Sequence, residues 1–415
     1  MSVPQGYFMS KIAVIGAGAA GLMAAYAAAS SGHAVTVFEK NEKSGKKIYI
    51  TGKGRCNVTH DCTPSEFLQN VVHNSKFLTS SIYSFSPQRC VEFFEDGGVR
   101  LKLERGGRYF PVSDKASDIT KCLENYCKNA GVDLKFGEEA IKLHILNSTM
   151  SGISTSKGDY KFDAVIVCTG GISYPSTGST GDGFKFASDA GHSVTPQVQA
   201  LCGLNLKGSY FKEMQGLTLK NVNLSVKYDG KIIKEFFGEM LFTHFGISGP
   251  IVLSASSIIN RLDLNKVLLT IDFKPALTIE QLDKRILRDF DSYKNKTISN
   301  CLKELLPSAA IGEVLRRCNI SSEQKVNCIT KPQRLTLLTM VKNFDMLVVS
   351  LRDFNEAIVT SGGVNVKEID PKTMESKLVK GLYFCGEVLD VDAFTGGYNL
   401  QIAFSTGFAA GNNIQ

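Results

Sequence analysis

The sequence lacks the short cysteine and histidine patterns that mark common metal and redox sites. No two of its 11 cysteines are separated by two residues, so we expect neither a zinc ribbon nor a thioredoxin-like dithiol. The six histidines form no HExxH pattern, and we expect no metal site. No secretory signal accompanies the cysteines, which indicates reduced thiols and a cytoplasmic location.

We also expect no membrane span. Residues 12–31 carry no charge and are long enough to cross a membrane, but Gly16, Gly18 and Gly21 interrupt them. The stretch is better interpreted as a buried strand, a tight turn and an alanine-rich helix. We expect the residues before it, 1–10, to form a disordered leader.

The charge balance gives no strong indication of a nucleic-acid partner. The net charge of +7 is mild for 415 residues and fits a protein that binds anionic ligands. Residues 274–342 hold 13 lysines and arginines against 7 acidic residues, so most of the net charge lies there. With 43% hydrophobic residues, the chain can bury a large core.

The chain begins and ends with the same alternation of strands and helices. Strands are predicted at 11–15, 34–39 and 382–385, and helices at 19–30 and from 398 onward. The middle of the chain instead alternates apolar and polar residues, with a hairpin turn at Asp229-Gly230. We therefore predict an α/β fold with a split Rossmann-like domain (1–192 and 356–415). An antiparallel β-barrel-like domain (193–273 and 343–355) is inserted into it and carries a helical insert (274–342).

The first functional motif is a GxGxxG turn between the first strand and the first helix. In this context the glycines permit a tight turn, the approach of a pyrophosphate and close helix–strand packing. Glu39 ends the second strand, where it would accept hydrogen bonds from an adenosine ribose. The expected dinucleotide contacts are Gly16, Gly18, Ala19, Ala20, Gly21 and Glu39.

Two further segments bring candidate contacts to the same cofactor. Residues 44–57 (SGKKIYITGKGRCN) are predicted to form a flexible cationic loop suited to a diphosphate or a flavin edge. The alternative is an exposed basic loop without a ligand, in which the cysteine is merely packed. Residues 163–171 (DAVIVCTGG) read as a buried strand that ends beside the cofactor. No second GxGxxG is present, so no separate NAD(P)H fingerprint is visible. The candidates are Lys47, Gly54, Arg55, Cys56, Asn57, Thr169 and Gly170.

The last segment combines acidic residues with a glycine-rich helix start. Amides at the start of the final helix would stabilise the negative charge that a reduced flavin carries at N1 and O2, and Glu387 or Asp392 would hold a ribityl hydroxyl. The alternative is a terminal helix with a glycine N-cap. The candidates are Gly386, Glu387, Asp392, Gly397, Tyr398, Asn399 and Leu400.

Candidates for an acid or base are few. His244 lies in the segment GEMLFTHFGISGP (238–250) and is attractive because histidine titrates near neutral pH. A lone histidine in an apolar loop is more often structural. Tyr398 is the second candidate.

The whole chain resembles the bacterial FAD-binding oxidoreductases of the aminoacetone oxidase family, which also includes bile-acid reductases. The segments VIGAGAAGLMAA (14–25), TGKGRCNVT (51–59), GRYFPVSDKASDI (107–119) and SYPSTGSTGDG (173–183) carry the resemblance. Residues 238–250 and GLYFCGEVLDVDAFTGGYNLQIAFSTG (381–407) complete it. The resemblance implies FAD as the cofactor, bound by the split domain, and adds Lys40 to the contacts.

We therefore expect an FAD-dependent oxidoreductase that acts on a small organic molecule by hydride transfer through flavin N5. Two variants stay open, an NAD(P)H-fed reductase of an unsaturated carbonyl compound and an amine oxidase that uses O₂. A hypothesis of another class is a flavin-containing RNA-associated protein that binds through the basic helical insert. The insert has no RNP-like or zinc motif and few aromatic residues, which disfavours nucleic acid as a partner.

Overall fold

The computed structural model describes residues 9–414, so most of the leader expected at 1–10 lies outside the described residues. The chain divides into two compact units, Met1–Ala200 with Ala357–Gln415, and Leu201–Glu356. The first unit extends past the expected boundary at 192 because strand β12 (Val194–Ala200) pairs with β19 (Val359–Val364). Each unit is described separately below.

The first unit is built on a parallel sheet. The five strands are, in spatial order, β20 (Leu382–Phe384), β11 (Ala164–Val167), β1 (Lys11–Ile15), β2 (Ala34–Glu39) and β7 (Asp133–Phe136). All four neighbouring pairs are parallel, and the central strands β1 and β11 are almost entirely buried. Continuous apolar strands of this kind are typical of parallel sheets covered on both faces. The predicted α/β fold of the Rossmann type is confirmed.

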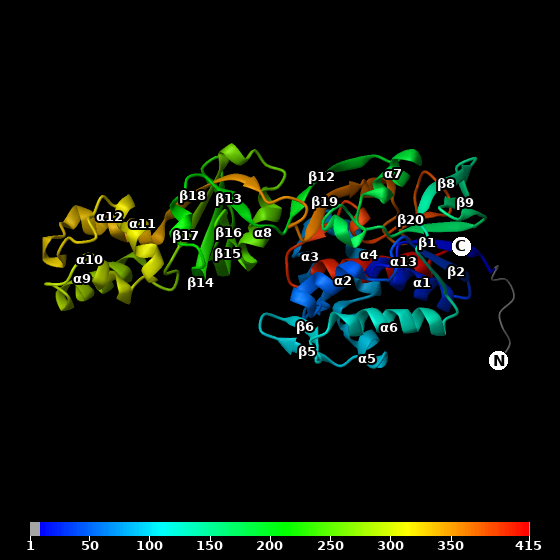
Figure 1. Cartoon of the computed structure of the whole chain (residues 1–415), viewed down its shortest axis with the longest axis horizontal. Helices are drawn as coiled ribbons and strands as arrows, with labels where there is room; N and C mark the ends of the chain where they lie inside the picture. The colour runs from blue at the N-terminus through cyan, green and yellow to red at the C-terminus, as the bar shows by residue number, and fades with distance from the viewer. Residues whose placement is uncertain (1–8, 415) are drawn as a thin grey trace. The chain divides into compact units, whose positions relative to one another are not determined.

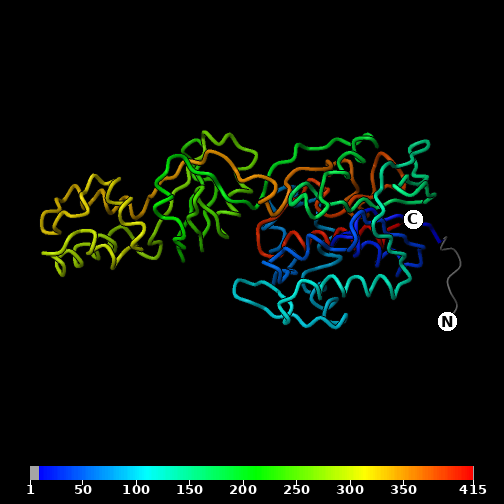
Figure 2. Tube along the Cα trace, in the orientation of Figure 1, coloured from blue at the N-terminus to red at the C-terminus, as the bar shows by residue number. Residues whose placement is uncertain are grey.

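Helix α1 (Ala19–Ser30) packs against two helices that lie far from it in sequence, α6 (Ala116–Asn129) and α13 (Tyr398–Asn412). Glycines in α13 allow its backbone to approach α1 closely. A Cβ at Gly407 would lie 2.4 Å from the Ala20 carbonyl oxygen, and one at Gly411 would lie 2.3 Å from the Ala24 oxygen. In Figure 2 the blue start and the red end of the described trace therefore run together in this unit.

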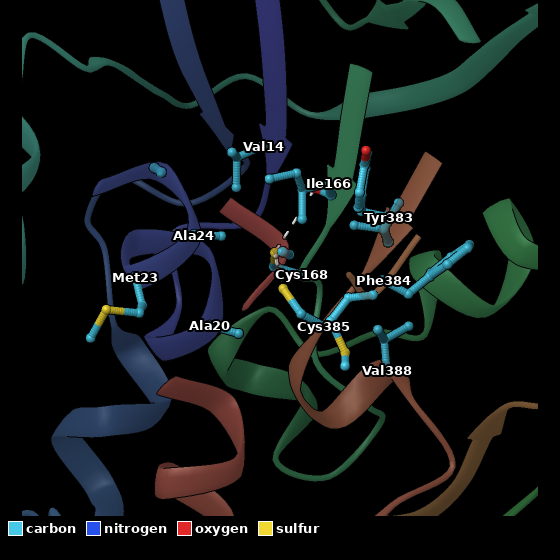
Figure 3. Close-up of a cluster of buried hydrophobic side chains, with 14 of the residues drawn as sticks. Val14, Ala20, Met23, Ala24, Ile166, Cys168, Tyr383, Phe384, Cys385 and Val388 are labelled. Atoms are coloured by element: carbon cyan, nitrogen blue, oxygen red, sulfur yellow. Dashed lines mark hydrogen bonds between the residues drawn. The ribbon is translucent and has the colours of Figure 1, made fainter. Parts of the chain in front are cut away.

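A buried cluster fills the space between α1 and the sheet (Figure 3). Val14, Ile166 and Phe384 contribute from three neighbouring strands, β1, β11 and β20. Cys168 and Cys385 follow β11 and β20, and their sulfur atoms lie 3.0 Å apart. Both cysteines are buried in the core, and burial raises the pKa of Cys168.

Shorter elements surround the sheet. The helices are α2 (Lys46–Ile50), α3 (Pro64–Leu68), α4 (Thr79–Ser84), α5 (Pro87–Asp96) and α7 (Asp182–Asp189). The small antiparallel sheets are β3 (Thr59–His60), β6 (Arg108–Pro111) and β5 (Leu101–Glu104); β8 (Ala140–Leu146), β9 (Thr149–Thr155) and β10 (Gly158–Tyr160); and the pair β4 (Val71–His73) and β21 (Asp392–Ala393).

The second unit contains a closed antiparallel barrel. Its strands are, in order, β13 (Leu204–Leu206), β16 (Gly246–Ser248), β15 (Lys231–Phe242), β14 (Thr218–Tyr228), β17 (Val267–Asp272) and β18 (Phe344–Leu351). Asp229 and Gly230, which join β14 to β15, have φ of 47° and 78°, as a tight hairpin turn requires.

Helices of the second unit share one core with the barrel. They are α8 (Pro250–Ile259), α9 (Ile279–Ser292), α10 (Ile298–Cys301), α11 (Ser308–Arg317) and α12 (Lys331–Lys342) (Figure 1). Thr278 and Gln281 form a capping box at the start of α9. Across residues 9–414, no helix has both the length and the apolar character needed to cross a membrane.

Alanine should have opposite effects on stability at two helical glycines, because only one of them lies at the close contact between α1 and α13. Gly407→Ala should lower the free energy of unfolding by about 1–3 kcal/mol because its Cβ meets the Ala20 backbone. Gly312→Ala is the matched control, since Gly312 lies within α11 and has open space around its Cβ. This control should raise stability by about 0.5–1 kcal/mol. Thermal and urea unfolding of both variants measure the effects, and an unchanged Gly407→Ala midpoint would contradict the contact.

Candidate cofactor site

The turn between β1 and α1 has the geometry of a dinucleotide-binding loop. Gly16 has a φ of 101°, and its N–H donates to the Phe38 carbonyl at 2.8 Å. A Cβ at Gly21 would lie 1.8 Å from the Gly16 oxygen, so only glycine fits there. A Cβ at Gly18, by contrast, would have no atom within 4 Å, and Gly18 caps α1 without a side-chain hydrogen bond. The helix start is thus open on the side where a pyrophosphate would approach.

Glu39 fixes this turn from the end of β2. Its carboxylate is buried and accepts the Ala17 N–H at 2.8 Å through Oε2, and the Asn41 N–H at 2.8 Å through Oε1. Oε1 also accepts from the side-chain amide of Asn41 at 2.6 Å, so Oε2 is the oxygen that retains capacity for a ribose hydroxyl. The neighbouring Lys40 instead pairs with Asp182 at 2.6 Å.

The segment 44–57 is not the flexible loop that the sequence suggested. It forms α2 and a short 3₁₀ turn (Thr51–Gly54), because Ile48 is buried and Lys47 has fixed partners. Lys47 Nζ lies 2.6 Å and 2.8 Å from the two carboxylate oxygens of Glu387 and 2.6 Å from Ser173 Oγ. The Thr360 N–H also donates to Glu387, at 2.8 Å. The structure thus joins two predicted cofactor residues that are far apart in the sequence.

The other predicted residues of this segment have different surroundings. Arg55 pairs with Glu104 at 2.9 Å and lies 4.1 Å from the centre of the Phe110 ring, while Gly54 is exposed. Cys56 is fully buried, and desolvation raises its pKa to about 12, so its thiol stays protonated. A redox role for this cysteine is therefore disfavoured.

Three predicted residues carry buried polar atoms that lack a partner. Within the described part of the chain, no hydrogen bond is made by Asn57 Oδ1, Thr169 Oγ1 or Asp392 Oδ2. Buried polar groups are normally satisfied, so each of these atoms is suited to a ligand group or an ordered water. Gly170, next to Thr169, has a φ of 74° and brings its backbone around the same turn. These features fit a bound dinucleotide.

The C-terminal part of the site is formed by a glycine pair and the start of α13. A Cβ at Gly397 would lie 2.7 Å from the Thr59 backbone, so glycine is required where these segments cross. Asn399 holds β21 beside the helix start, because its amide bonds to both the N–H and the carbonyl of Ala393, at 3.0 Å and 2.9 Å. Gly386 N–H donates to Thr406 within α13 at 2.9 Å. The first turn of α13 contains no acidic residue and its N-cap has no side-chain hydrogen bond, so its amides are suited to an electron-rich group.

The two predicted acid–base candidates lie in different units. Tyr398 is buried, and its ring stacks on His60 with centroids 4.7 Å apart. Burial raises the pKa of Tyr398, so the hydroxyl stays protonated at neutral pH. His244 is exposed at the end of β15, edge-on to the Phe245 ring at 5.1 Å. A catalytic role for either residue stays a prediction.

The structure also brings together residues that the sequence did not connect. Asp392 is fully buried, and its Oδ1 lies 2.6 Å from Nδ1 of His73 and 2.9 Å from Ser361 Oγ. His73 stands alone in the sequence, 319 residues from Asp392, and no motif marks it. Only the pairing of β4 with β21 reveals the contact.

Comparisons with known proteins identify the family of the chain. The sequence pattern of the HI0933-like protein Rossmann domain matches residues 10–413. A 3-dehydro-bile acid delta(4,6)-reductase of Clostridium scindens is 31% identical over 97% of this chain and 98% of its own. A ribosomal RNA dihydrouridine synthase of Haemophilus influenzae is 30% identical over 97% of both chains.

Solved structures share the fold at lower sequence identity. The 3-ketosteroid delta1-dehydrogenase of Sterolibacterium denitrificans is 14% identical, with a TM-score of 0.52 over 98% of this chain and 99% of that one. Because the family pattern spans both ends of the split domain, the chain belongs to the HI0933-like family of Rossmann-domain proteins and is an FAD-dependent oxidoreductase.

Proposed function

We propose that this protein uses FAD and NAD(P)H to reduce a carbon–carbon double bond conjugated to a carbonyl group in a small organic molecule. The observation that carries the proposal is the chemistry shared by two full-length relatives. One is named as a delta(4,6)-reductase of 3-dehydro-bile acids, whose double bonds are conjugated to a ketone. The other is named as a dihydrouridine synthase, and the uracil bond that dihydrouridine lacks is conjugated to the C4 carbonyl.

When bound, the flavin would supply hydride transfer through N5. The chain's residues would position it: the amides at the start of α1 would bind the diphosphate, and Glu39 would accept from the adenosine ribose. Lys47 and Glu387 form a fixed ion pair of 2.6 Å that is suited to hold the polar edge of the cofactor. The amides at the start of α13 would stabilise negative charge on the reduced flavin. Asn57 and Thr169 offer unsatisfied buried oxygens to the same ligand.

The electron donor is proposed to dock transiently rather than at a dedicated fold. No second GxGxxG is present in the sequence, so a nicotinamide would approach the flavin directly. An amine oxidase on the same fold would take electrons from its substrate and pass them to O₂. The two alternatives differ in the molecule that reduces the flavin and in the molecule that reoxidises it.

Anaerobic spectroscopy separates the two alternatives. We expect the purified protein to show flavin absorption that bleaches with NADPH or NADH and returns when cyclohex-2-enone or a 3-oxo-4,6-diene steroid is added. The control adds a simple amine in place of the pyridine nucleotide and should leave the bands unchanged. Bleaching by amines with peroxide release in air, and none by NAD(P)H, would favour the oxidase and defeat the proposal.

The open space at Gly18 predicts that a small side chain there weakens FAD binding without disturbing the fold. Gly18→Ala should leave the fold intact, because its φ of −83° suits alanine and the new methyl group meets no protein atom. The methyl group would occupy the space of the pyrophosphate, so FAD affinity should fall about tenfold or more. Fluorescence titration of the apoprotein with FAD measures the change. Gly312→Ala, also an open glycine, should bind FAD as the unmodified protein does.

A second candidate is the reduction of uridine in RNA. Two relatives named as ribosomal RNA dihydrouridine synthases cover 97% of this chain, at 30% and 27% identity. The helical insert has the basic excess that RNA binding requires. Part of that charge is internally paired, because Glu313 binds both Arg316 and Arg317 at 2.6 Å, and Arg317 packs 3.9 Å from the centre of the Phe344 ring. Arg317 is therefore structural, whereas Arg316 is paired but largely exposed.

Exposed lysines test this candidate more cleanly. Lys296 and Lys325 lie on neighbouring backbone segments. The Val326 N–H donates to the Lys296 carbonyl at 3.0 Å, and Thr297 forms an isolated antiparallel β-bridge with Lys325. If RNA is the substrate, Lys296→Glu with Lys325→Glu should weaken RNA binding at low salt about tenfold or more and reduce its salt dependence. Lys142→Glu with Lys161→Glu, two exposed lysines of the first unit, is the charge-matched control. Absence of RNA binding by the unmodified protein at low salt rules this candidate out.

A further inference from the structure

A buried carboxylate and a half-buried imidazole face each other across two short strands. Asp392 in β21 is opposite His73 in β4, and Oδ1 of Asp392 lies 2.6 Å from Nδ1 of His73. Ser361 Oγ donates to the same carboxylate oxygen at 2.9 Å. An ionised carboxylate only accepts hydrogen bonds, so Nδ1 of His73 carries the proton and donates it. The ring is therefore fixed in one tautomer and one orientation.

The second nitrogen of His73 is open. The side chain of His73 is 24% exposed, while that of Asp392 is fully buried beneath it. Nε2 of His73 has no hydrogen-bond partner among residues 9–414. His192 shows the contrasting structural arrangement, because it is buried with one nitrogen 3.1 Å from Glu368 and the other 2.8 Å from Ser376. His73 is held by one nitrogen and leaves the other for a ligand.

Contacts place this pair within the proposed flavin site. Adjacent residues of β19 hold the two acids, since Ser361 donates to Asp392 and the Thr360 N–H donates to Glu387 at 2.8 Å. Glu387 in turn binds Lys47. The residue after Asp392 is clamped to the first turn of α13 by Asn399. The imidazole is thus attached to the same strands that would hold the isoalloxazine end of the cofactor.

The geometry points to His73 as the catalytic proton donor of the proposed reaction, with Asp392 as its positioning residue. The inference rests on the proposed function, because reduction of a conjugated double bond needs a proton as well as a hydride. Among acid candidates, His73 is better arranged than Tyr398, whose ring is buried against His60. It has a fixed orientation, an open nitrogen and a buried carboxylate behind it.

The step balances in atoms and charge. The β-carbon of the substrate receives the hydride, which carries the two electrons that NAD(P)H supplied. The α-carbon takes the proton from Nε2–H of the protonated imidazole, so the double bond becomes a single bond. Neutral His73 then regains a proton from water. The sum is NAD(P)H, a proton and the unsaturated carbonyl compound giving NAD(P)⁺ and the saturated compound.

Asp392 acts through His73. Its negative charge stabilises the positive charge on the ring before proton transfer, and its hydrogen bond keeps the proton on Nδ1 after transfer. Replacing it by asparagine removes the charge, and the amide can donate to Nδ1, which moves the proton of the neutral ring to Nε2. Asp392→Asn should therefore impair proton donation without displacing the ring.

Stopped-flow measurement on the anaerobic holoenzyme tests the role of His73. The flavin is reduced with dithionite and then mixed with cyclohex-2-enone or, separately, with ferricyanide, which accepts electrons without taking a proton at carbon. His73→Gln should slow reoxidation by the enone about 10²- to 10⁴-fold and leave reoxidation by ferricyanide unchanged. Asp392→Asn should show a smaller loss of the same kind. Imidazole in the buffer should partly restore the rate at which the enone reoxidises the His73→Gly variant.

A matched control comes from a second histidine near a serine and an aspartate. His144 in β8 lies 2.7 Å from Ser154 Oγ and 4.0 Å from Asp159, on a sheet that contributes no residue to the proposed site. His144→Gln should leave both reoxidation rates unchanged. Equal enone rates for His73→Gln and the unmodified protein would overturn the assignment.

A measurement independent of activity reads the orientation of the ring. In nitrogen-15 spectra of histidine-labelled protein, we expect neutral His73 to carry its proton on Nδ1, and on Nε2 in Asp392→Asn. The His73→Gln spectrum identifies the resonances by their absence. A proton on Nε2 in the unmodified protein would overturn the positioning role of Asp392.

The outcomes separate the proposed function from the assignment of the proton donor. If no enone reoxidises the unmodified protein while ferricyanide does, the proposed function fails and the donor role fails with it. If enones reoxidise the unmodified protein and His73→Gln equally well, the proposed function stands and only the donor assignment falls.

Discussion

The first unit depends on a backbone-to-backbone contact that only glycine permits. Gly21 packs α1 onto the Gly16 turn, and Gly407 packs α13 onto the Ala20 carbonyl. In each case a Cβ would lie within 2.4 Å of a main-chain oxygen, which cannot move without shifting its whole element. The contact therefore joins the start of the chain to its end and sets the dinucleotide turn and the start of α13 relative to each other within this unit. The cofactor site inherits its geometry from these helices.

Buried charge is the second constraint on the site. Glu39, Glu387 and Asp392 are each at least partly buried, and each accepts hydrogen bonds from a main-chain amide, a lysine, a hydroxyl or an imidazole. Removing a carboxylate from water is costly unless such donors replace the water. The acids are consequently held in fixed positions before a ligand binds. Such preorganisation is what a site needs to orient a cofactor and to stabilise charge as it develops.

Local patterns in the sequence predicted the fold well where a few adjacent residues decide the structure. The first strand and helix and the Asp229-Gly230 turn follow from short-range rules. The prediction of a flexible loop at 44–57 was wrong. Its glycines favoured a loop, but the segment contains a short helix that burial of Ile48 stabilises. The Lys47–Glu387 pair joins residues 340 apart, and only tertiary packing brings them together. The glycines and acids of the cofactor site were thus predictable as residue types, whereas His73 was not.

The second unit is inserted into the first at one point of the chain's fold. The chain leaves the first unit after β12 and returns before β19, and Ala200 and Val359 are direct partners in that antiparallel pair. Residues 201–356 therefore depart from and return to one point of the first unit. Changes of sequence or length within them need not alter the sheet, the α1–α13 contact or the buried acids. Relatives named for a bile acid and for ribosomal RNA match this chain over 97% of its length. Under the proposed function, the conjugated double bond asks the same chemistry of the first unit whatever molecule carries it.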